Sequence, residues 1–542
     1  MKHLTRCLLI LLSLLLLPLG CKKADASKAS AEIALTDAAL KAAEQPDDNN
    51  RVFYEIFVGS FSDSNGDGIG DLRGIINRMD YLNDGDPSSG RSLGVEGLWL
   101  TPIFSSPSYH KYDVTDYYAI DPQFGTEDDL KELLTLCHSR DVKVILDLPI
   151  NHTGRRNEWF KTFLEAHRQG DTQNPYYNFY CWYDGDTASA PAGRSYGQLS
   201  GTHHYYECNF SSDMPELNFD DELVRKTVVE IALHYIDLGV DGFRFDAAKY
   251  VYFGDHQKSL DFWLWYLGTL RRQKPDLYTV AEVWDSDGIT DLYYPATNCF
   301  NFTISQASGL IAETAKKGDV NKFTAYIDAY QKHVAAMRDG AAIAPFLTNH
   351  DTDRAAGFLT VASGTMQIAA NLYILGPGTP FLYYGEELGM RGSRGGANTD
   401  ANRRLAMLWG DGDTVADPVG TTYSRSNQIE TTVHDQIQDP GSLYNYYKKL
   451  LMVRRANPEI ARGTYTALSV PNSKVGGFAS SYNGRTVLVL HNTTITSKTV
   501  DLSTVTDLPI DTLKNVIGLE DASLDGTTLT IGAQTSVVIG TK

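Results

Sequence analysis

Long apolar runs are scarce in this chain of 542 residues. The longest, nearly unbroken, extends from Cys7 to Leu19, whereas a membrane-spanning helix needs about 20 apolar residues. Positive charge is also in short supply: 48 Lys and Arg face 67 Asp and Glu, for a formal net charge of −19. Such a negative surface repels nucleic acid and anionic lipid, so we expect neither as a partner, while a neutral substrate is compatible.

Cysteine is rare as well. The chain has six, and none of them forms a CxxC spacing, which argues against a zinc site. Cys181 and Cys208 occur in one irregular segment. They either pair in an oxidising compartment or stay as two free thiols, and the sequence leaves both readings open.

The N-terminus has the pattern of a signal peptide. Lys2 and Arg6 precede the apolar run, and Gly20 and Cys21 follow it. A small residue before Cys resembles a bacterial lipoprotein signal, with Cys21 as the lipidated N-terminus; the alternative is an ordinary signal peptide that contains a cysteine. We expect residues 1–21 to be this signal and 22–50 to be a tether. The protein would then be exported and lipid-anchored at the bacterial cell envelope, or otherwise extracellular.

Eight segments rich in β-branched and aromatic residues follow, most of them separated by helical patterns such as 127–140 and 221–239. Nearly continuous apolar runs are typical of strands that are buried on both faces. The segments begin at Val52, Val95, Val142, Val240, Tyr278, Asn298, Ala344 and Thr379. Eight strands with intervening helices predict an α/β fold, a (β/α)₈ TIM barrel formed by residues 51–151 and 219–458.

Two further parts do not fit the barrel pattern. Residues 152–218, after the third strand, are rich in Tyr, Gly, Asn and His and are too long for an ordinary connection, which predicts an inserted domain. Residues 459–542 contain short alternating strands and no helical pattern, which predicts a C-terminal all-β sandwich domain.

Several predicted strands end in polar residues. Barrel enzymes hold their catalytic groups at the C-terminal ends of the strands, so these residues are candidates for an active site. They are Asp147, Asn151 and His152 on the third strand, Arg244 and Asp246 on the fourth, Glu282 on the fifth, and His350 and Asp351 on the seventh. One acid at a strand end is usually a cap or a turn residue, but coincidence does not explain the whole set.

Three of these acids suit the hydrolysis of a glycosidic bond, which needs one ionised carboxylate and one carboxyl group that holds a proton. Arg244 precedes Asp246 by two residues on one strand face, so its charge favours an ionised nucleophile at Asp246. The apolar residues after Glu282 disfavour its charge, which suits a proton donor. We expect Asp351 to bind sugar hydroxyls and to help keep Glu282 protonated.

These residues lie in the motifs DLPINH, GFRFDAAK, EVW and FLTNHD, which make the chain resemble the α-amylase superfamily of glycoside hydrolases. The resemblance covers roughly residues 51–542, and MPELN (Met214–Asn218) resembles a fifth motif of that family. It implies retaining hydrolysis, with Asp246 as nucleophile, Glu282 as general acid/base and Asp351 as stabiliser of the transition state. Retention places the two key carboxyl groups about 5–5.5 Å apart.

The resemblance also implies the residues that contact the sugar. Arg244 would orient the nucleophile, and His152 and His350 would hydrogen-bond the sugar at the cleavage subsite. Tyr112 would stack beneath this sugar. Lys249 would contact the sugar on the leaving-group side, and the alternative is a solvated lysine.

A calcium site is expected in the segment DSNGDGIGD, residues 63–71. Three Asp and one Asn on a compact loop would repel one another without a cation, although a plain Asp/Gly-rich turn is the alternative. The resemblance implies as ligands Asp63, Asn65, Asp67, the carbonyl of Ile69 and Asp71. Many α-amylases hold another calcium ion through an Asn at the position of Asn151, for which Tyr250 would supply a carbonyl.

The bond that is cut follows from the residues after the nucleophile. Ala247, Ala248 and Lys249 resemble α-amylases, whereas Tyr250 and MPELN are nearer to the neopullulanase group. We therefore expect cleavage of internal α-1,4-glucosidic bonds in starch-type glucans and maltooligosaccharides. The alternatives are a neopullulanase, cyclomaltodextrinase or oligo-α-glucosidase, a glucan transferase, and a non-catalytic glucan-binding lipoprotein. The sequence leaves the oligomeric state open.

Overall fold

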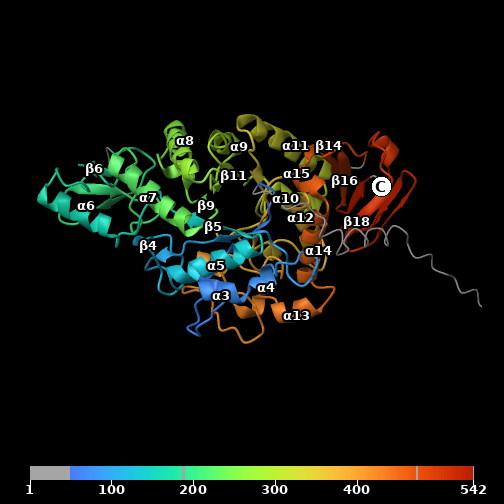
Figure 1. Ribbon diagram of the computed structural model, residues 1–542, viewed down its shortest axis with the longest axis horizontal. Helices are drawn as coiled ribbons and strands as arrows, with labels where there is room; N and C mark the ends of the chain where they lie inside the picture. Colours follow the sequence, from blue (N-terminus) through green and yellow to red (C-terminus); the bar gives the residue numbers. More distant parts are fainter. Residues whose placement is uncertain (1–48, 186–189, 472–473, 541–542) are drawn as a thin grey trace, which may run out of the picture.

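A computed structural model describes residues 49–185, 190–471 and 474–540 of the chain (Figure 1). The expected signal peptide with Cys21, and all but the last two residues of the expected tether, lie outside the described residues. None of the helices described is long and apolar enough to cross a membrane.

Eight parallel strands form the central sheet. In spatial order they are β12 (Ile343–Ala344), β11 (Asn298–Phe300), β10 (Tyr278–Ala281), β9 (Gly242–Phe245), β5 (Lys143–Leu148), β2 (Gly97–Leu100), β1 (Phe53–Ile56) and β13 (Phe381–Tyr383). A parallel bridge between Phe346 and Phe381 joins the two outermost strands and closes the sheet into a barrel. The predicted (β/α)₈ barrel is thus confirmed, with all eight expected segments as its strands.

Helices surround this barrel (Figure 1). They are α3 (Leu72–Asn77), α4 (Met79–Leu82), α5 (Glu127–Ser139), α7 (Glu222–Leu238), α8 (His256–Gln273), α9 (Asp287–Thr290), α10 (Leu310–Lys317), α11 (Val320–Met337), α12 (Thr365–Ile374), α13 (Val433–Gln438) and α14 (Leu443–Ala456). The helix α5 begins with a capping box in which Thr126 and Asp129 each accept the other's backbone N–H. The helical patterns at 127–140 and 221–239 are therefore confirmed as α5 and α7.

Aromatic and aliphatic side chains fill the interior of the barrel. The Phe53 ring lies between those of Tyr278 and Phe381, with centroids 5.1 and 5.2 Å away. The full interior cluster is Phe53, Trp99, Ile145, Tyr278, Val280, Phe300, Phe302, Ala344, Phe346 and Phe381. Because this core leaves no room for a ligand inside the barrel, a substrate must bind at the mouth.

The connection between β5 and α7 forms the predicted inserted domain. It contains α6 (Glu158–Gln169) and a three-stranded antiparallel sheet in the order β6 (Trp182–Asp184), β8 (His204–Glu207) and β7 (Tyr196–Gln198). It projects from one end of the molecule, at the left of Figure 1. A two-stranded sheet, β3 (Phe104–Ser105) and β4 (Asp116–Ile120), lies in the loop after β2.

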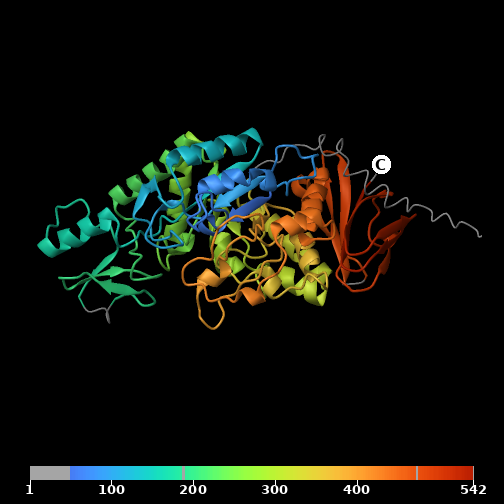
Figure 2. The ribbon, with the colours of Figure 1, turned by 90° about the horizontal axis from the view of Figure 1, so that it is seen from below.

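The C-terminal region forms two antiparallel sheets that pack on each other, at the right of Figure 2. The five-stranded sheet has the order β14 (Thr464–Leu468), β15 (Val475–Tyr482), β16 (Arg485–Asn492), β21 (Thr535–Gly540) and β18 (Thr512–Gly518). The smaller sheet has the order β17 (Lys498–Asp501), β20 (Thr528–Ile531) and β19 (Ala522–Asp525). One detail differs from expectation: a short helix, α15 (Pro458–Arg462), begins this region, because Pro458 supplies a favourable first helical residue.

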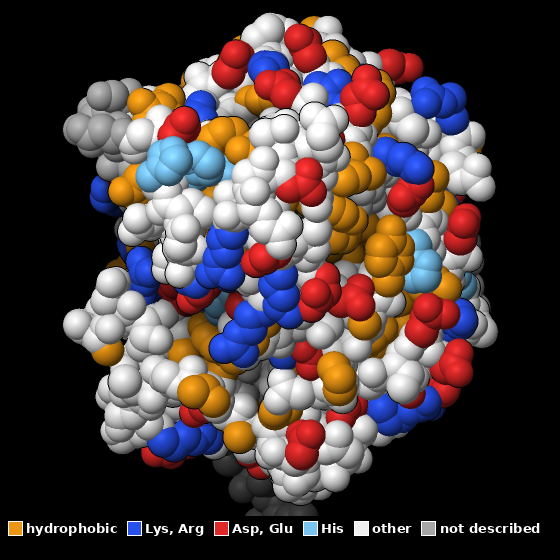
Figure 3. Space-filling view, turned by 90° about the vertical axis from the view of Figure 1, so that its left-hand side faces the viewer, with side chains coloured by type: hydrophobic (Ala, Val, Ile, Leu, Met, Phe, Trp, Pro, Cys, Tyr) orange, Lys and Arg blue, Asp and Glu red, His pale blue; other side chains and the backbone are white. Residues whose placement is uncertain are grey.

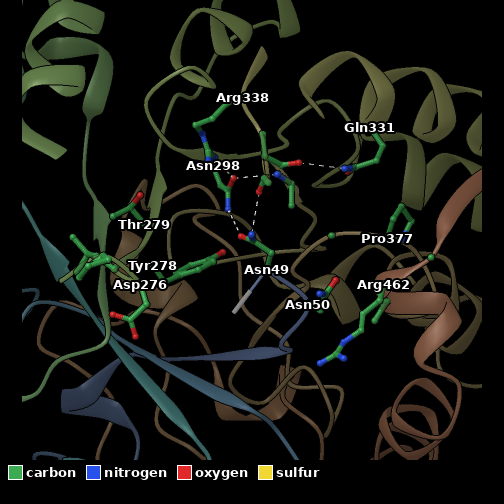
Figure 4. Close-up of a pocket in the computed structure, with 18 of the residues that line it drawn as sticks. Asn49, Asn50, Asp276, Tyr278, Thr279, Asn298, Gln331, Arg338, Pro377 and Arg462 are labelled. Carbon is green, nitrogen blue, oxygen red and sulfur yellow. Dashed lines mark hydrogen bonds between the residues drawn. The ribbon is translucent and has the colours of Figure 1, made fainter. Parts of the chain in front are cut away.

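A cavity of about 600 Å³ lies at the opposite end of the barrel from the predicted strand-end site (Figure 4). Residues at the N-terminal ends of β10 and β11 line it, together with Asn49 and Asn50. The side chain of Asn49 donates to the Gly340 carbonyl (3.0 Å) and accepts from Asn298 Nδ2 (2.9 Å). The end of the expected tether thus contacts the base of the barrel, away from the mouth where barrel enzymes perform catalysis.

Candidate active site

The C-terminal ends of neighbouring strands bring the candidate nucleophile and proton donor together. Asp246 follows β9, and Glu282 follows β10. Arg244, fully buried inside β9, places Nη1 2.7 Å from Asp246 Oδ1 and Nη2 3.1 Å from Glu282 Oε2. One guanidinium therefore holds both carboxyl groups at the mouth of the barrel.

Asp147 fixes this guanidinium from behind. Its Oδ1 lies 2.8 Å from Arg244 Nη1, and its Oδ2 accepts a hydrogen bond from the Tyr112 hydroxyl at 2.8 Å. The Trp99 indole N–H donates to the same Oδ2 at 3.3 Å. Because these partners hold the buried Asp147 in one position, Arg244 has a fixed position as well.

The backbone turn after Asp246 links the two strand ends. Ala247 has a left-handed conformation (φ 49°), which is uncommon for a residue with a Cβ. In that conformation its N–H donates to Glu282 Oε2 at 3.0 Å, and the N–H of Ala248 donates to the Glu282 carbonyl at 3.0 Å. The turn thus orients the Glu282 carboxyl group toward Asp246.

The third acid, Asp351, lies in the loop after β12 between two cationic partners. His350 Nε2 is 3.0 Å from Asp351 Oδ2, and Arg404 Nη2 is 2.7 Å from Asp351 Oδ1. On its other side His350 Nδ1 contacts Glu55 Oε1 at 2.5 Å. A chain of alternating charges therefore extends from β1 to the mouth of the barrel.

The surroundings give the three acids different protonation behaviour. Burial raises the pKa of Glu282 to about 7, with the charges of Asp246 and Asp351 acting in the same direction against Arg244. Burial also raises the pKa of Asp246, and Arg244 opposes that effect. Burial alone would raise the pKa of Asp351, but His350 and Arg404 hold it well below its usual value. Near neutral pH Glu282 can thus carry the proton while Asp351 stays ionised.

His350 is held in its charged form by neighbouring carboxylates. Burial disfavours the imidazolium, but the adjacent Asp351 and Glu55 raise the pKa of His350 to about 10. Its ring also stacks on Tyr112, with centroids 5.6 Å apart and planes 14° from parallel. The structure thus brings His350 and Tyr112 together beside the acids, as expected for sugar-binding residues, although their contact with a sugar stays a prediction.

The environment of His152 is that of a ligand-binding residue. It is buried, and neither of its ring nitrogens has a hydrogen-bond partner among the described residues. Burial lowers the pKa of His152 to about 4, so the ring is neutral. Leaving buried nitrogens unpartnered costs free energy, which a sugar hydroxyl would recover. Phe210, 45% exposed, packs on this ring at 5.4 Å and extends the wall of the site.

Lys249 lies at the rim of the same mouth. Its Nζ donates to the Trp284 carbonyl at 2.7 Å and pairs with Asp285 at 2.8 Å. Lys249 thus links the turn after β9 to the loop after β10, and it is not a solvated lysine. Trp284 is 42% exposed and stacks on Phe302, with centroids 5.0 Å apart.

Two charged residues of this site escaped the sequence analysis. Glu55 is the one charged residue within the apolar segment VFYEIFV. A single charge within a buried strand is a signal from which its role could have been predicted. Arg404 lies in the loop after β13, 53 positions from Asp351, and nothing in its local sequence marks it.

The loop 63–71 forms a tight turn in which side-chain oxygens accept backbone N–H groups. Oδ1 of Asp63, Asn65 and Asp67 each accepts the N–H two residues further on, at 3.0, 2.9 and 2.8 Å. Gly66 and Gly68 have φ of 83° and 88°, which only glycine adopts easily. Asp71 caps α3 by accepting from Gly74 N at 2.6 Å.

The donor chemistry of this loop fits a calcium ion. Asp63, Asp67 and Asp71 have no Lys or Arg within salt-bridge distance among the residues that the structure describes. Their negative charges are therefore not neutralised by a side chain, and Ca²⁺ prefers such hard oxygen ligands. Gly68 also bonds through its carbonyl to Ala416 N at 2.8 Å, which closes the loop against a second segment.

The second expected calcium position has a different environment. Asn151 Nδ2 donates to the carboxylate of Glu216, within MPELN, while Asn151 Oδ1 is buried and lacks a hydrogen-bond partner in the described part of the chain. The other expected partner, Tyr250, packs its ring on Phe210 with centroids 4.9 Å apart. The amide of Asn151 thus links the end of β5 to the inserted domain through Glu216.

The thiols of Cys181 and Cys208 are both free, so they do not form the disulfide that the sequence left open. Cys181 Sγ instead contacts the Leu217 carbonyl at 3.4 Å. Burial raises the pKa of Cys181 above its usual value and that of Cys208 to about 11, so neither is a reactive thiolate at neutral pH.

A TIM barrel with an inserted domain, a C-terminal β sandwich and acids at its strand ends defines a class of enzymes that act on glycosidic bonds. The sequence profile of the alpha-amylase catalytic domain matches residues 55–463. The chain therefore belongs to the α-amylase family of glycoside hydrolases.

Particular relatives agree with this assignment. "Alpha-amylase 3" of Dictyoglomus thermophilum is 34% identical over 446 residues, covering 82% of this chain and 84% of that protein. The "Oligo-1,6-glucosidase" of Parageobacillus thermoglucosidasius is 28% identical, covering 81% and 89%. The solved structure of "Eubacterium rectale Amy13B" is 34% identical, has a TM-score of 0.84, and covers 93% of this chain and 98% of its own.

Proposed function

We propose that this enzyme is an α-amylase that hydrolyses internal α-1,4-glucosidic bonds of starch-type glucans and maltooligosaccharides. The observation that carries the proposal is the set of three acids around Arg244, in which Glu282 has a pKa of about 7 and Asp351 is held ionised. An α-amylase among the relatives that cover most of the chain supports this choice.

In the first step the Asp246 carboxylate attacks the anomeric carbon, and the glycosidic C–O bond breaks. Glu282 transfers its proton to the leaving oxygen, so the released glucan carries a hydroxyl group. Asp351 stabilises the positive charge that develops on the sugar ring. Arg244, 2.7 Å from Asp246, keeps the nucleophile oriented.

In the second step Glu282, now a carboxylate, removes a proton from water. The resulting hydroxide attacks the anomeric carbon and breaks the ester bond to Asp246, so the sugar retains its configuration. If a sugar hydroxyl replaces water in this step, the product is a longer glucan. The same site thus allows a glucan transferase as an alternative.

An oligo-α-glucosidase or a neopullulanase is the second candidate. The motif MPELN, and an oligo-1,6-glucosidase among the relatives that cover most of the chain, favour this alternative. The retained pattern Ala247, Ala248 and Lys249 after the nucleophile favours α-1,4 specificity.

Product analysis on a maltooligosaccharide with a blocked non-reducing end tests the proposal. An α-amylase releases internal fragments from it, whereas an exo-acting α-glucosidase leaves it intact. Starch, pullulan, cyclodextrin and isomaltose complete the panel, and cleavage of isomaltose alone would exclude an α-amylase. In Asp246→Asn the release of reducing sugar should fall at least about 10³-fold, because the nucleophile is lost. Unchanged release would show that the assigned mechanism is wrong. No release from the wild type on any of these substrates would instead favour a non-catalytic glucan-binding lipoprotein.

Calcium and the membrane anchor are part of the same proposal. Asp63, Asn65, Asp67, Asp71 and the Ile69 carbonyl would hold the ion, which would stiffen the loop without taking part in the chemistry. For the anchor, export and lipidation at Cys21 rest on the sequence pattern. The variant Cys21→Ser should be released from the cell envelope, and its retention there would contradict a lipid anchor.

A further inference from the structure

A cluster of two histidines and one aspartate lies on the inserted domain, away from the catalytic acids. His203 Nε2 is 3.0 Å from Asp184 Oδ1, and His204 Nε2 is 3.7 Å from the same oxygen. One ligand atom from each of the three lies within 4.8 Å of the others. Histidine side chains gather at the surface on this end of the molecule in Figure 3.

Strand pairing fixes the positions of these residues. Asp184 ends β6, and its Cα partner in the antiparallel ladder is His204, the first residue of β8. Side chains of directly paired residues lie on the same face of a sheet, so both point toward one spot. His203 immediately precedes β8 and reaches the same carboxylate.

Hydrogen bonds behind His204 determine which of its nitrogens can bind a ligand. His167 Nε2 lies 2.9 Å from the Tyr177 carbonyl, which only accepts, so this nitrogen carries a hydrogen. His167 is 4% exposed, and its Nδ1 lies 2.8 Å from His204 Nδ1. This contact uses His204 Nδ1 and leaves His204 Nε2 as the nitrogen that faces Asp184.

His204 Nε2 lies 3.7 Å from Asp184 Oδ1, and His203 Nε2 faces the same oxygen. Two ring nitrogens and a carboxylate oxygen thus converge on one point at the surface. This is the arrangement of a metal-binding histidine whose tautomer is set by a hydrogen bond from its other nitrogen. His167 and Tyr177 thus form the support of the site, with their rings stacked 4.0 Å apart.

We propose that Asp184, His203 and His204 form a binding site for Zn²⁺, with water as a fourth ligand. Two imidazoles and one carboxylate are ligands that zinc prefers. Tetrahedral bonds of about 2.0–2.1 Å place neighbouring ligand atoms about 3.3 Å apart, between the 3.0 and 3.7 Å observed. The absence of a CxxC spacing argued against a zinc site with cysteine ligands, whereas this site would use no cysteine.

Zinc at this position would connect β6 to β8 and stiffen the inserted domain, whose Glu216 pairs with His152 at the wall of the active site. The zinc ion would have a structural role, because the cluster contacts none of the catalytic acids. Binding should therefore raise the melting temperature and leave kcat nearly unchanged.

Isothermal titration of the full chain with ZnCl₂, in excess calcium to saturate the loop at 63–71, tests the proposal. We expect one zinc ion per chain and at least a tenfold loss of affinity in His203→Ala, His204→Ala and Asp184→Asn. His203 is largely exposed, so its variant should fold even if His204→Ala does not. The matched control is His333→Ala, which removes an exposed histidine 3.0 Å from Asp291.

A second measurement identifies the coordination. Co²⁺ in place of zinc should give the strong visible absorption of a tetrahedral site in the wild type and in His333→Ala, and lose it in His203→Ala. Zinc should raise the melting temperature of the wild type and leave that of His203→Ala unchanged. Equal zinc affinity in wild type and His203→Ala, or no binding at 100 times the protein concentration, would overturn the proposal.

Discussion

Arg404 provides the sharpest test of how the active site is held together. Its Nη2 is 2.7 Å from Asp351 Oδ1, its Nε donates to the His350 carbonyl at 3.1 Å, and its Nη1 donates to the Tyr109 hydroxyl at 3.1 Å. It is 5% exposed and lies outside the sequence motifs that identified the other site residues. The substitution Arg404→Gln removes the charge while keeping a side chain of similar reach.

The expected loss follows from the bond to Asp351. A hydrogen bond to a charged group contributes about 1.5–3 kcal/mol. If the transition state loses this free energy of stabilisation, kcat falls about 10- to 150-fold, at about 1.4 kcal/mol per factor of ten. Because the proposed role of Asp351 lies in the transition state, kcat should fall more than KM rises. Arg404→Lys keeps the charge without the planar fork and should recover part of the activity.

Steady-state kinetics on a blocked maltooligosaccharide, with a thermal melt of each variant, measures this effect. Arg404 lowers the pKa of Asp351, so its loss should raise that pKa toward its usual value. The matched control is Arg78→Gln, which removes a guanidinium paired with Asp411 and Asp413 outside the active site. A folded Arg404→Gln variant with kcat within threefold of wild type would show that Arg404 does not position Asp351.

Two more predictions concern protons and calcium. Glu282 must be protonated to act as an acid, and its pKa is about 7; kcat/KM should therefore fall about tenfold per pH unit above pH 7. This alkaline decline should flatten with a glycosyl fluoride, whose leaving group needs no proton, and a decline of the same slope would assign the limb to another residue. Removal of calcium by EDTA should lower the melting temperature, and Asp67→Asn should abolish the dependence on calcium, since an amide still accepts the Ile69 N–H at 2.8 Å but lacks the charge. Asp116→Asn, which changes an acid with the same kind of turn bond at 2.9 Å, should keep that dependence.

The barrel and the candidate acids could be predicted from local sequence patterns alone. The apolar segments of the barrel strands are nearly continuous because both faces of each strand are buried, and that pattern is local. Asp246, Glu282 and Asp351 were found for a related reason: the topology of a parallel barrel places the C-terminal ends of all strands at one mouth.

Other elements needed the tertiary structure. In the C-terminal region the alternating segments RTVLVLHNTT, KTVDLS, TLTIG and TSVVIG predict β16, β17, β20 and β21. The strands β14, β15, β18 and β19 were not predicted, because short strands in an antiparallel sandwich are defined by their partners more than by their own residues. The all-β prediction for residues 459–542 also differs from the structure at its beginning, where Pro458–Arg462 form the helix α15.

The pairing of the charged residues depends on the tertiary structure. Arg404 reaches Asp351 across 53 positions, and Glu55 reaches His350 across 295, so no spacing rule could connect them. The same holds for Asp184 and His204, which a strand register brings together. Residue type and local pattern specify what a side chain can do, whereas its pKa and its partners depend on burial and on neighbours that are distant in the sequence.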